Sequence, residues 1–243
     1  MTKIYAVGDI HGQLDMLQEV LELIEDDGGP EASIVFLGDY IDRGPDSCGV
    51  LDFLIQARDA GRNWIFLKGN HDRMFEWFLQ TPSRGDPYLF FDVNWLHHRL
   101  GGQDTLRSYG LDFSMRRRLS DVHAEALVSV PKGHHVFLSQ CQLSYDTPNL
   151  FFCHAGIRPG VALQAQDEED LLWIRNEFYR HLAAHPKMIV HGHSPVDQAS
   201  HYGNRINLDT GAGYGKPLTA AVFEAGACFV LTSEGRKEIL PIG

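Results

Sequence analysis

The sequence predicts an α/β fold, because short strand-like runs alternate with amphipathic helical patterns along much of the chain. Each run is rich in β-branched or aromatic residues and stops abruptly at a side chain that can bind a metal. With the residues that follow them, the six runs read KIYAVGDIHG, IVFLGDYIDRG, WIFLKGNHD, LFFCHAGIRPG, KMIVHGHSP and RINLDTGAG. In α/β folds ligands collect at the carboxyl ends of strands, so we expect these polar side chains to line one crevice.

Two amphipathic helices are predicted between the first three runs. Residues 14–26 and residues 47–60 both repeat apolar side chains at the spacing of one helix face. The middle of the chain, about residues 82–140, departs from the alternation and carries a further helical pattern over residues 119–130. We expect a single domain of residues 1–243, in which this middle segment is a helical insertion beside the strand ends and shapes a substrate pocket.

The charge of the chain argues against two classes of partner. The 243 residues include 32 acidic and 21 basic side chains, for a formal charge of −11, and such a surface repels a phosphate backbone or an anionic membrane. The short basic run at residues 116–118 is interpreted as a solvated helix face. We therefore expect no nucleic-acid partner and no membrane partner.

The cysteines and the first residues favour a cytoplasmic protein. The cysteines are widely spaced without a Cys-x-x-Cys pair, which predicts reduced core residues at Cys48, Cys141, Cys153 and Cys228. The first strand-like run begins within three residues of Met1, which leaves no room for a signal segment. No apolar run approaches the roughly 18 residues that a membrane-spanning helix needs.

The side chains at the strand ends suit a metal centre. Asp9 and His11 are two residues apart, so both can face one ion. Asp39 has two carboxylate oxygens with which to bridge two cations. Later strand ends add an amide oxygen and two imidazoles, from Asn70, His154 and His193. Mixed donors of this kind favour manganese, iron or zinc over calcium or magnesium, and they suffice for two divalent or trivalent ions.

Two metals roughly 3.5–4 Å apart are the arrangement used for in-line displacement at phosphorus. Three further residues fit that chemistry. The guanidinium of Arg43 is a planar fork suited to phosphate oxygens. His71 is placed to give a proton to the departing alkoxide, and Asp42 can hold that imidazole protonated and oriented.

The ordered motifs Gly-Asp-x-His-Gly, Gly-Asp-x-x-Asp-Arg-Gly and Gly-Asn-His, followed by two separated His strand ends, resemble the calcineurin-like metallophosphoesterases, in their phosphoprotein phosphatase branch. The segments DLLWIR, at residues 170–175, and LDTGA, at residues 208–212, extend the similarity to nearly the whole chain. Together with GGQDTLRSYG and VHGHSP, they are most similar to bacterial, Rhizobiales-like serine/threonine protein phosphatases.

This resemblance implies a fold and a set of roles. The fold is two mixed β-sheets packed face to face and flanked by helices. The first metal would be held by Asp9, His11 and Asp39, and the second by Asp39, Asn70, His154 and His193. Phosphate would be bound by Arg43 and Arg175, with His71 and Asp42 as the acid pair.

Two of these assignments have alternatives. His191 faces the same side of an extended segment as His193 and is an alternative ligand. Arg175 is alternatively a structural partner of Asp170 or Glu177. Five further histidines are expected to be surface or locally hydrogen-bonded residues, namely His97, His98, His134, His135 and His201. Trp173 is expected in the core.

The implied activity is that of a phosphomonoesterase acting on phosphorylated Ser, Thr or Tyr side chains by direct attack of a metal-bridging hydroxide, with manganese the favoured metal. The alternative is a symmetrical dinucleoside tetraphosphatase or a small-molecule phosphoesterase. Asp72, where eukaryotic members usually have Glu, leaves the substrate class open. The symmetrical dinucleoside tetraphosphatases typically have Ala at the position of Asp42, so the Asp in this sequence favours the protein phosphatase activity. A non-catalytic scaffold would need neither the acid pair nor Arg43.

Overall fold

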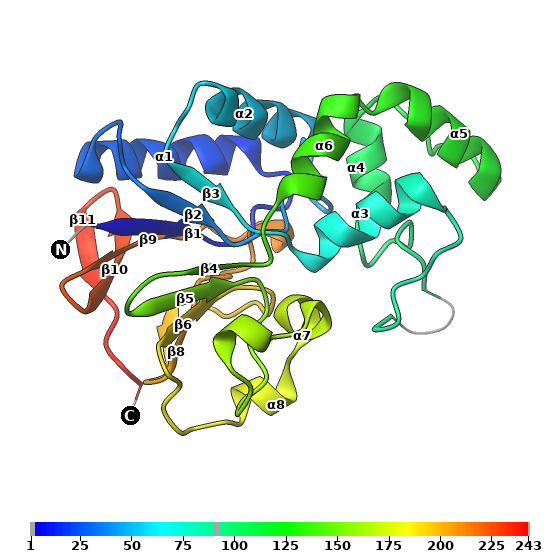
Figure 1. The fold of residues 1–243 in the computed structure, drawn as a ribbon. Coiled ribbons are helices and arrows are strands. Elements are labelled where there is room, and N and C mark those ends of the chain that lie inside the picture. The colour runs from blue at the N-terminus through cyan, green and yellow to red at the C-terminus, as the bar shows by residue number, and fades with distance from the viewer. Residues whose placement is uncertain (1–2, 90–92, 243) are drawn as a thin grey trace.

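The computed structural model describes residues 3–89 and 93–242. These residues form two mixed β-sheets packed face to face and flanked by helices, which confirms the fold class expected from the sequence (Figure 1). The first sheet has the strand order β11 (Gly235–Glu238), β10 (Ala227–Thr232), β9 (Ala220–Glu224), β1 (Ile4–Val7), β2 (Ile34–Phe36) and β3 (Trp64–Phe66). The second has the order β4 (Ser144–Asp146), β5 (Leu150–Cys153), β6 (Met188–His191), β8 (Arg205–Asn207) and β7 (Ser200–His201).

Each sheet contains three parallel strands. β1, β2 and β3 run parallel in the first sheet, and β5, β6 and β8 run parallel in the second. The other named strands pair antiparallel. Parallel neighbours end at the same edge of their sheet, so each sheet gathers three of the six polar strand ends.

Successive side chains of the strands lie on opposite faces, and this alternation explains why the sheets stack. In β1, Ala6 belongs to a cluster formed by both sheets, whereas Tyr5 and Val7 on the other face belong to the helix-covered core. The second sheet repeats the pattern, because Phe152 joins the cluster between the sheets and Phe151 faces the opposite way. Both faces of these strands are apolar, as expected for strands buried on two sides.

Helices cover the outer faces (Figure 1). Against the first sheet lie α1 (Leu14–Gly28) and α2 (Ser47–Asp59), which begin where the sequence predicted. α1 continues beyond the predicted residue 26 and is followed by Gly29 at φ 79°, a conformation that glycine adopts easily. The second sheet is flanked by η1 (Leu163–Ala165), α7 (Glu168–Trp173) and α8 (Asn176–Tyr179), and η2 (Ala212–Tyr214) follows β8.

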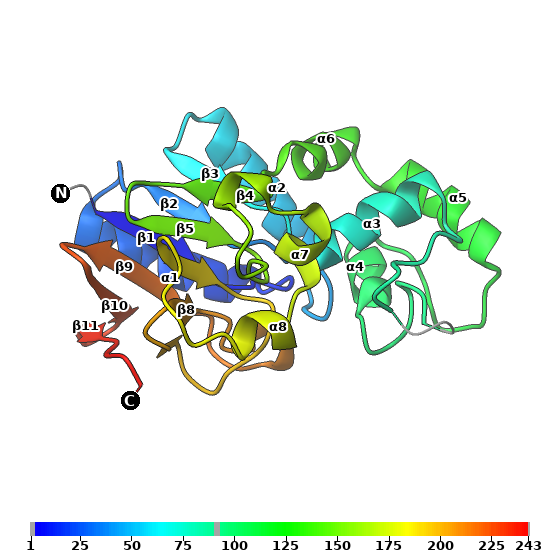
Figure 2. The same cartoon turned by 60° about the horizontal axis from the view of Figure 1, so that its bottom comes forward.

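A group of helices stands to one side of the sandwich, as Figure 2 shows. It comprises α3 (Asn70–Gln80), α4 (Gly102–Ser108), α5 (Leu119–Ser129) and α6 (Lys132–Gln140). The last three fall within the helical insertion expected at residues 82–140, of which residues 90–92 lie outside the described part of the chain. The assignment of all 243 residues to one domain stays a prediction.

Two details of the sequence interpretation are wrong. The basic run at residues 116–118 precedes α5 instead of forming a face of it, and Arg117 pairs with Glu125. His134 is not a surface or locally bonded residue. It is buried, with Nδ1 2.7 Å from the Tyr109 hydroxyl and Nε2 2.9 Å from Asp52 Oδ1, because three helices meet there.

The core residues largely follow expectation. Trp173 is buried in the helix-covered core. All four cysteines are free, and Cys48 is half-buried whereas the other three are buried. Within residues 3–89 and 93–242, no helix is long and apolar enough to cross a bilayer.

The contact between the sheets can be tested at Phe152. Its side chain is fully buried and meets the ring of Phe223 edge-on at a centroid distance of 5.8 Å. Phe152→Ala leaves a cavity between the sheets and should lower the free energy of unfolding by about 3–5 kcal/mol in urea titrations. Leu182→Ala, at an exposed position, is the control. A loss below about 1 kcal/mol at Phe152 would contradict the described packing.

Candidate metal centre

The polar strand ends of both sheets meet in one buried cluster. All six expected ligands are buried, namely Asp9, His11, Asp39, Asn70, His154 and His193. The first four follow β1, β2 and β3, and the two later histidines follow β5 and β6. Contacts cross between the sheets, since Asn70 Oδ1 lies 2.9 Å from His154 Nε2 and 2.8 Å from His193 Nδ1.

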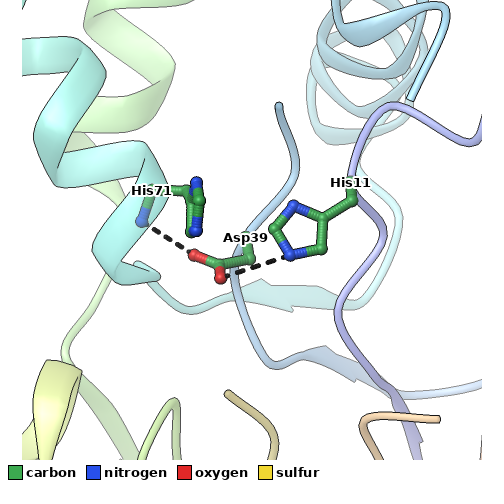
Figure 3. A group of neighbouring side chains, drawn as sticks. All are labelled: His11, Asp39 and His71. Atoms are coloured by element: carbon green, nitrogen blue, oxygen red, sulfur yellow. Dashed lines mark hydrogen bonds and ion pairs between the residues drawn. The ribbon is translucent and has the colours of Figure 1, made fainter. Parts of the chain in front are cut away.

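The carboxylate of Asp39 lies between His11 and His71 (Figure 3). Its Oδ2 atom lies 3.6 Å from His11 Nε2 and 3.5 Å from His154 Nε2. Its Oδ1 atom accepts a hydrogen bond of 2.9 Å from the backbone N–H of His71. One carboxylate oxygen thus faces an imidazole on each side, which is the placement that a ligand shared by two cations requires.

Backbone carbonyls orient two of the imidazoles. His11 Nδ1 lies 2.7 Å from the carbonyl oxygen of Ile41, and His154 Nδ1 lies 2.9 Å from that of Leu37. A carbonyl can only accept, so each Nδ1 carries the proton and each Nε2 presents a lone pair to Asp39. This is how metal-binding histidines are usually held.

The imidazole nitrogens that face the cluster have no proton to donate in a hydrogen bond, which fits a cation bound between them. With its proton on Nδ1, His154 presents only a lone pair to the amide oxygen of Asn70. His193 Nε2 is buried without a hydrogen-bond partner among the described residues. In the described part of the chain, two groups of potential ligands have their donor atoms within 4.8 Å of one another. One group is His11, Asp39 and His71, and the other is Asp39, His154 and His193. The donor set therefore suits metal ions.

The pKa shifts in the cluster also indicate a site suited to metal ions. Burial raises the pKa of Asp9 well above its usual value, and the charges of Asp209 and Asp39 raise it further. Burial likewise raises the pKa of Asp39 to about 7 and lowers that of His154 to about 4. Cations at this point would lower both pKa values, which would offset the effect of burial on Asp39 and add to its effect on His154, because a positive charge favours carboxylates and neutral imidazoles.

Unusual backbone conformations concentrate at the same place. Six non-glycine residues of the described chain have positive φ, and all but Ala225 are candidate site residues, namely His11, Asp39, Asp42, Arg43 and His193. Such conformations typically cost about 1–3 kcal/mol each and persist where the surroundings enforce them. The fold therefore accepts local strain in order to aim these side chains.

The proposed acid pair is assembled as the sequence suggested. His71 Nδ1 lies 2.6 Å from Asp42 Oδ2, and its Nε2 lies 3.0 Å from an Arg43 guanidinium nitrogen. The other terminal nitrogen of Arg43 contacts His11 Nε2. Burial raises the pKa of Asp42 and lowers that of His71, so burial alone favours a neutral pair. A phosphate dianion beside the imidazole would favour its protonated form.

Geometry separates the alternatives for Arg175 and His191. Asp170 and Glu177 both pair with Arg158, whereas Arg175 donates to Ser194 Oγ at 3.2 Å. Burial dominates the pKa shifts of Asp39 and His193; the charge of Arg175 partly opposes the rise at Asp39 and adds to the fall at His193.

His191 turns away from Asn70. Its Nε2 lies 3.2 Å from an Arg205 nitrogen, and its ring packs on Phe178 and Tyr179. His193 instead contacts Asn70, so the geometry favours it over His191 as the ligand.

A family model decides the wider relationship. The model described as calcineurin-like phosphoesterase matches residues 2–217. This chain is a calcineurin-like phosphoesterase. The resemblance found in the motifs is thus confirmed, and so is the expectation of a metal-dependent phosphatase-type hydrolase.

Relatives of this phosphoesterase carry two kinds of name. The asymmetrical bis(5'-nucleosyl)-tetraphosphatase PrpE of Oceanobacillus iheyensis is 26% identical over 91% of this chain and 88% of its own, and that of Bacillus thuringiensis is 24% identical over 88% and 87%. A structure of a putative diadenosine tetraphosphatase matches with a TM-score of 0.66 and 21% identity, covering 98% of this chain and 94% of that one. A cold-active protein-tyrosine phosphatase of a psychrophile Shewanella sp. matches at 0.63 and 19%, covering 99% and 81%. These two structures share the fold.

Asp72 organises the phosphoesterase site in a way that its sequence motif did not reveal. Its buried carboxylate accepts backbone N–H groups from Asp39 at 2.8 Å, Tyr40 at 3.0 Å and Gly69 at 2.8 Å. The loops after β2 and β3 are thereby tied together. Little space remains between them, because a Cβ on Gly69 would lie 2.1 Å from Asp39 Oδ1.

Asp209 is a second residue that the sequence interpretation left unassigned. It follows β8, the sixth polar strand end, and is buried, with Oδ1 accepting the N–H of Gly211 at 2.9 Å. A Cβ on Gly192 would lie 2.0 Å from Asp9 Oδ1 and 3.6 Å from Asp209 Cβ, which places the two aspartates side by side. Its position at the end of the run RINLD was the available signal.

The central position of Asp39 gives a direct test. Asp39→Asn removes the anionic charge between the two donor groups, so the variant should bind fewer manganese ions per chain than the parent protein in calorimetric titration. Asp197→Asn, which changes an exposed carboxylate paired with Lys216, is the control and should leave metal binding unchanged. Equal stoichiometry and affinity in the parent and Asp39→Asn would contradict a shared ligand.

Proposed function

We propose that this phosphoesterase hydrolyses dinucleoside tetraphosphates asymmetrically, with two metal ions. The observation that carries the proposal is the name shared by its relatives, which match at 23–26% identity over 88–91% of this chain. This favours the alternative activity over the phosphoprotein activity expected first, and asymmetrical cleavage over symmetrical cleavage.

The metal ions would be held by the clustered strand ends. We assign Asp9, His11 and Asp39 to one ion, and the second to Asp39, Asn70, His154 and His193, with manganese as the first candidate metal and iron or zinc as others. Asp9 is the least direct of these, because its carboxylate oxygens lie 3.0 and 3.3 Å from the backbone nitrogen of His193. Bound cations would neutralise charge on the phosphoryl group and activate water.

Two arginines are suited to the polyphosphate. The guanidinium of Arg43 contacts His11 and His71 inside the cluster. Arg175 lies between α7 and α8, and its side chain is exposed. Each guanidinium can donate charge-assisted hydrogen bonds to non-bridging oxygens.

An aromatic ring beside Arg43 supports a nucleotide substrate. The Arg43 guanidinium lies 4.9 Å from the centroid of the Tyr214 ring, and Tyr214 is 62% exposed. An exposed ring next to a phosphate-binding group offers a stacking face for a nucleobase. The residue lies on η2, directly after the glycine that packs against His11.

The acid pair favours a second candidate, a phosphomonoesterase. Hydrolysis of a phosphoanhydride releases a stable nucleotide anion, which has little need of a proton donor, whereas an alkoxide from phosphoserine needs one. His71 and Asp42, bonded at 2.6 Å, would provide it. Phosphorylated Ser, Thr or Tyr side chains therefore remain the alternative substrates.

Further expectations about the setting belong to the same proposal. We place the enzyme in the cytoplasm, because its cysteines are unpaired and free thiols are typical of reducing compartments. We expect neither nucleic acid nor a membrane as partner, because the formal charge is −11.

A substrate panel tests the proposal. The manganese-loaded enzyme should cleave diadenosine tetraphosphate to ATP and AMP with a higher kcat/KM than it shows for phosphoserine and phosphotyrosine peptides, as followed by chromatography. Release of two ADP molecules would replace the asymmetrical activity by the symmetrical one. Faster turnover of a phosphopeptide would favour the second candidate.

The proposed role of Arg175 in phosphate binding can be tested separately from metal binding. Arg175→Ala should cost on the order of 2–4 kcal/mol in kcat/KM and weaken inhibition by inorganic phosphate, because one charge-assisted donor is lost. Arg180→Ala, at the exposed end of the same helix, is the matched control. Both variants should keep their metals. Lower thermal stability of Arg175→Ala with unchanged phosphate inhibition would instead identify a structural residue.

A further inference from the structure

Both carboxylate oxygens of Asp42 are held by side chains from the segment between α3 and α5. The indole Nε1–H of Trp95 donates to Asp42 Oδ2 at 2.8 Å. The hydroxyl of Thr105, on α4, donates to Oδ1 at 2.6 Å. Asp42 is fully buried, so these bonds are made without competition from bulk water.

Thr105 also fixes the backbone of Asp42. Its Oγ1 accepts the Asp42 N–H at 2.9 Å, and Ser47 Oγ lies 3.1 Å from the same nitrogen. One hydroxyl therefore bonds both the backbone N–H and the carboxylate of a residue whose φ is 73°, a value that is uncommon outside glycine. Thr105 determines where the carboxylate points as well as what it bonds.

Two glycines bring this segment close to Asp42 and its neighbours. Gly101, at φ 90°, packs so tightly on Arg43 that a Cβ would lie 2.3 Å from its backbone nitrogen. A Cβ on Gly102 would lie 2.6 Å from the Trp95 ring. The two glycines of the GGQDT sequence thus allow α4 to pack closely against the loop that carries Asp42 and Arg43.

We propose that Trp95 and Thr105 are positioning residues, which hold Asp42 so that His71 is aimed at the leaving-group oxygen. The proposal rests on the proposed function in one respect, namely that the site cleaves phosphate esters or anhydrides. Trp95 and α4 then take part in proton delivery, in addition to any pocket that they shape.

The chemistry explains what such positioning would change. His71 uses Nδ1 to bond Asp42 at 2.6 Å, which leaves Nε2 facing Arg43 and the interior of the cluster. A bound phosphate dianion would favour the protonated imidazole. When the bond from phosphorus to the leaving oxygen breaks, the proton on Nε2 would pass to that oxygen and the imidazole would become neutral. A misplaced ring would slow the departure of poor leaving groups and spare good ones.

The main experiment compares leaving groups in Thr105→Val, which has nearly the same shape but no hydroxyl. For phosphoserine, kcat should fall about tenfold more than for 4-nitrophenyl phosphate, because the nitrophenolate needs little protonation. KM and manganese content should change little, since neither Arg43 nor a metal donor is altered. Thr105→Ser, which restores the hydroxyl, should recover the parent ratio.

A matched control and a spectroscopic measurement exclude a purely structural role. Ser108→Ala removes a hydroxyl from the end of the same helix, where it bonds the carbonyl oxygen of Thr105 at 2.6 Å and not Asp42. In proton NMR, the His71 Nδ1–H resonance, assigned through its loss in His71→Asn, should shift or exchange with water in Thr105→Val and in Trp95→Phe. It should stay in place in Ser108→Ala.

The outcomes separate this proposal from the proposed function. Equal slowing of both esters in Thr105→Val, or an unmoved His71 resonance, overturns the positioning role. If the parent enzyme cleaves no phosphate compound, the proposed function fails, and the NMR comparison alone still decides whether Trp95 and Thr105 hold the pair.

Discussion

The buried negative charge of Asp39 is the constraint on which the rest of the site depends. A carboxylate taken out of water must be compensated, and here the compensation comes from the N–H of His71, from the charges of Arg43 and Arg175, and from a donor set that suits cations. Its own backbone, at φ 51°, is held by the carboxylate of Asp72. A second buried acid is thus used to place the first.

The two sheets contribute different chemistry to this arrangement. The anionic candidate ligands, Asp9 and Asp39, follow strands of the first sheet, as do His11 and Asn70, whereas the candidate ligands from the second sheet, His154 and His193, are both imidazoles. Asp209 adds a further carboxylate from the second sheet beside Asp9. The burial that raises the pKa of these acids is produced by the stacking of the sheets, so the same packing stabilises the fold and prepares the cluster for cations.

Sequence patterns predicted the parts of this design that are local. The strand ends and the two helices after β1 and β2 could be predicted from short stretches, because burial and periodicity produce recognisable patterns in consecutive residues. Long-range contacts produce no such pattern. Trp95 and Thr105 bond Asp42 across 53 and 63 residues, and Asp72 reaches Asp39 across 33. Residues 116–118 were misplaced because charge alone does not distinguish a helix face from the loop before it.

Asn70 touches two histidines from the opposite sheet, and that contact has a consequence for cooperativity. A cation held by Asn70 together with His154 and His193 would cross-link the two layers, closing a span of 84 residues to His154 and 123 to His193. Separation of the two sheets would therefore destroy this cation site even while each sheet stayed folded. Cation binding would in turn stabilise the packed arrangement of the two sheets by mass action. Catalytic competence in this molecule is a property of the whole stack, and a fragment bearing one layer would have lost it.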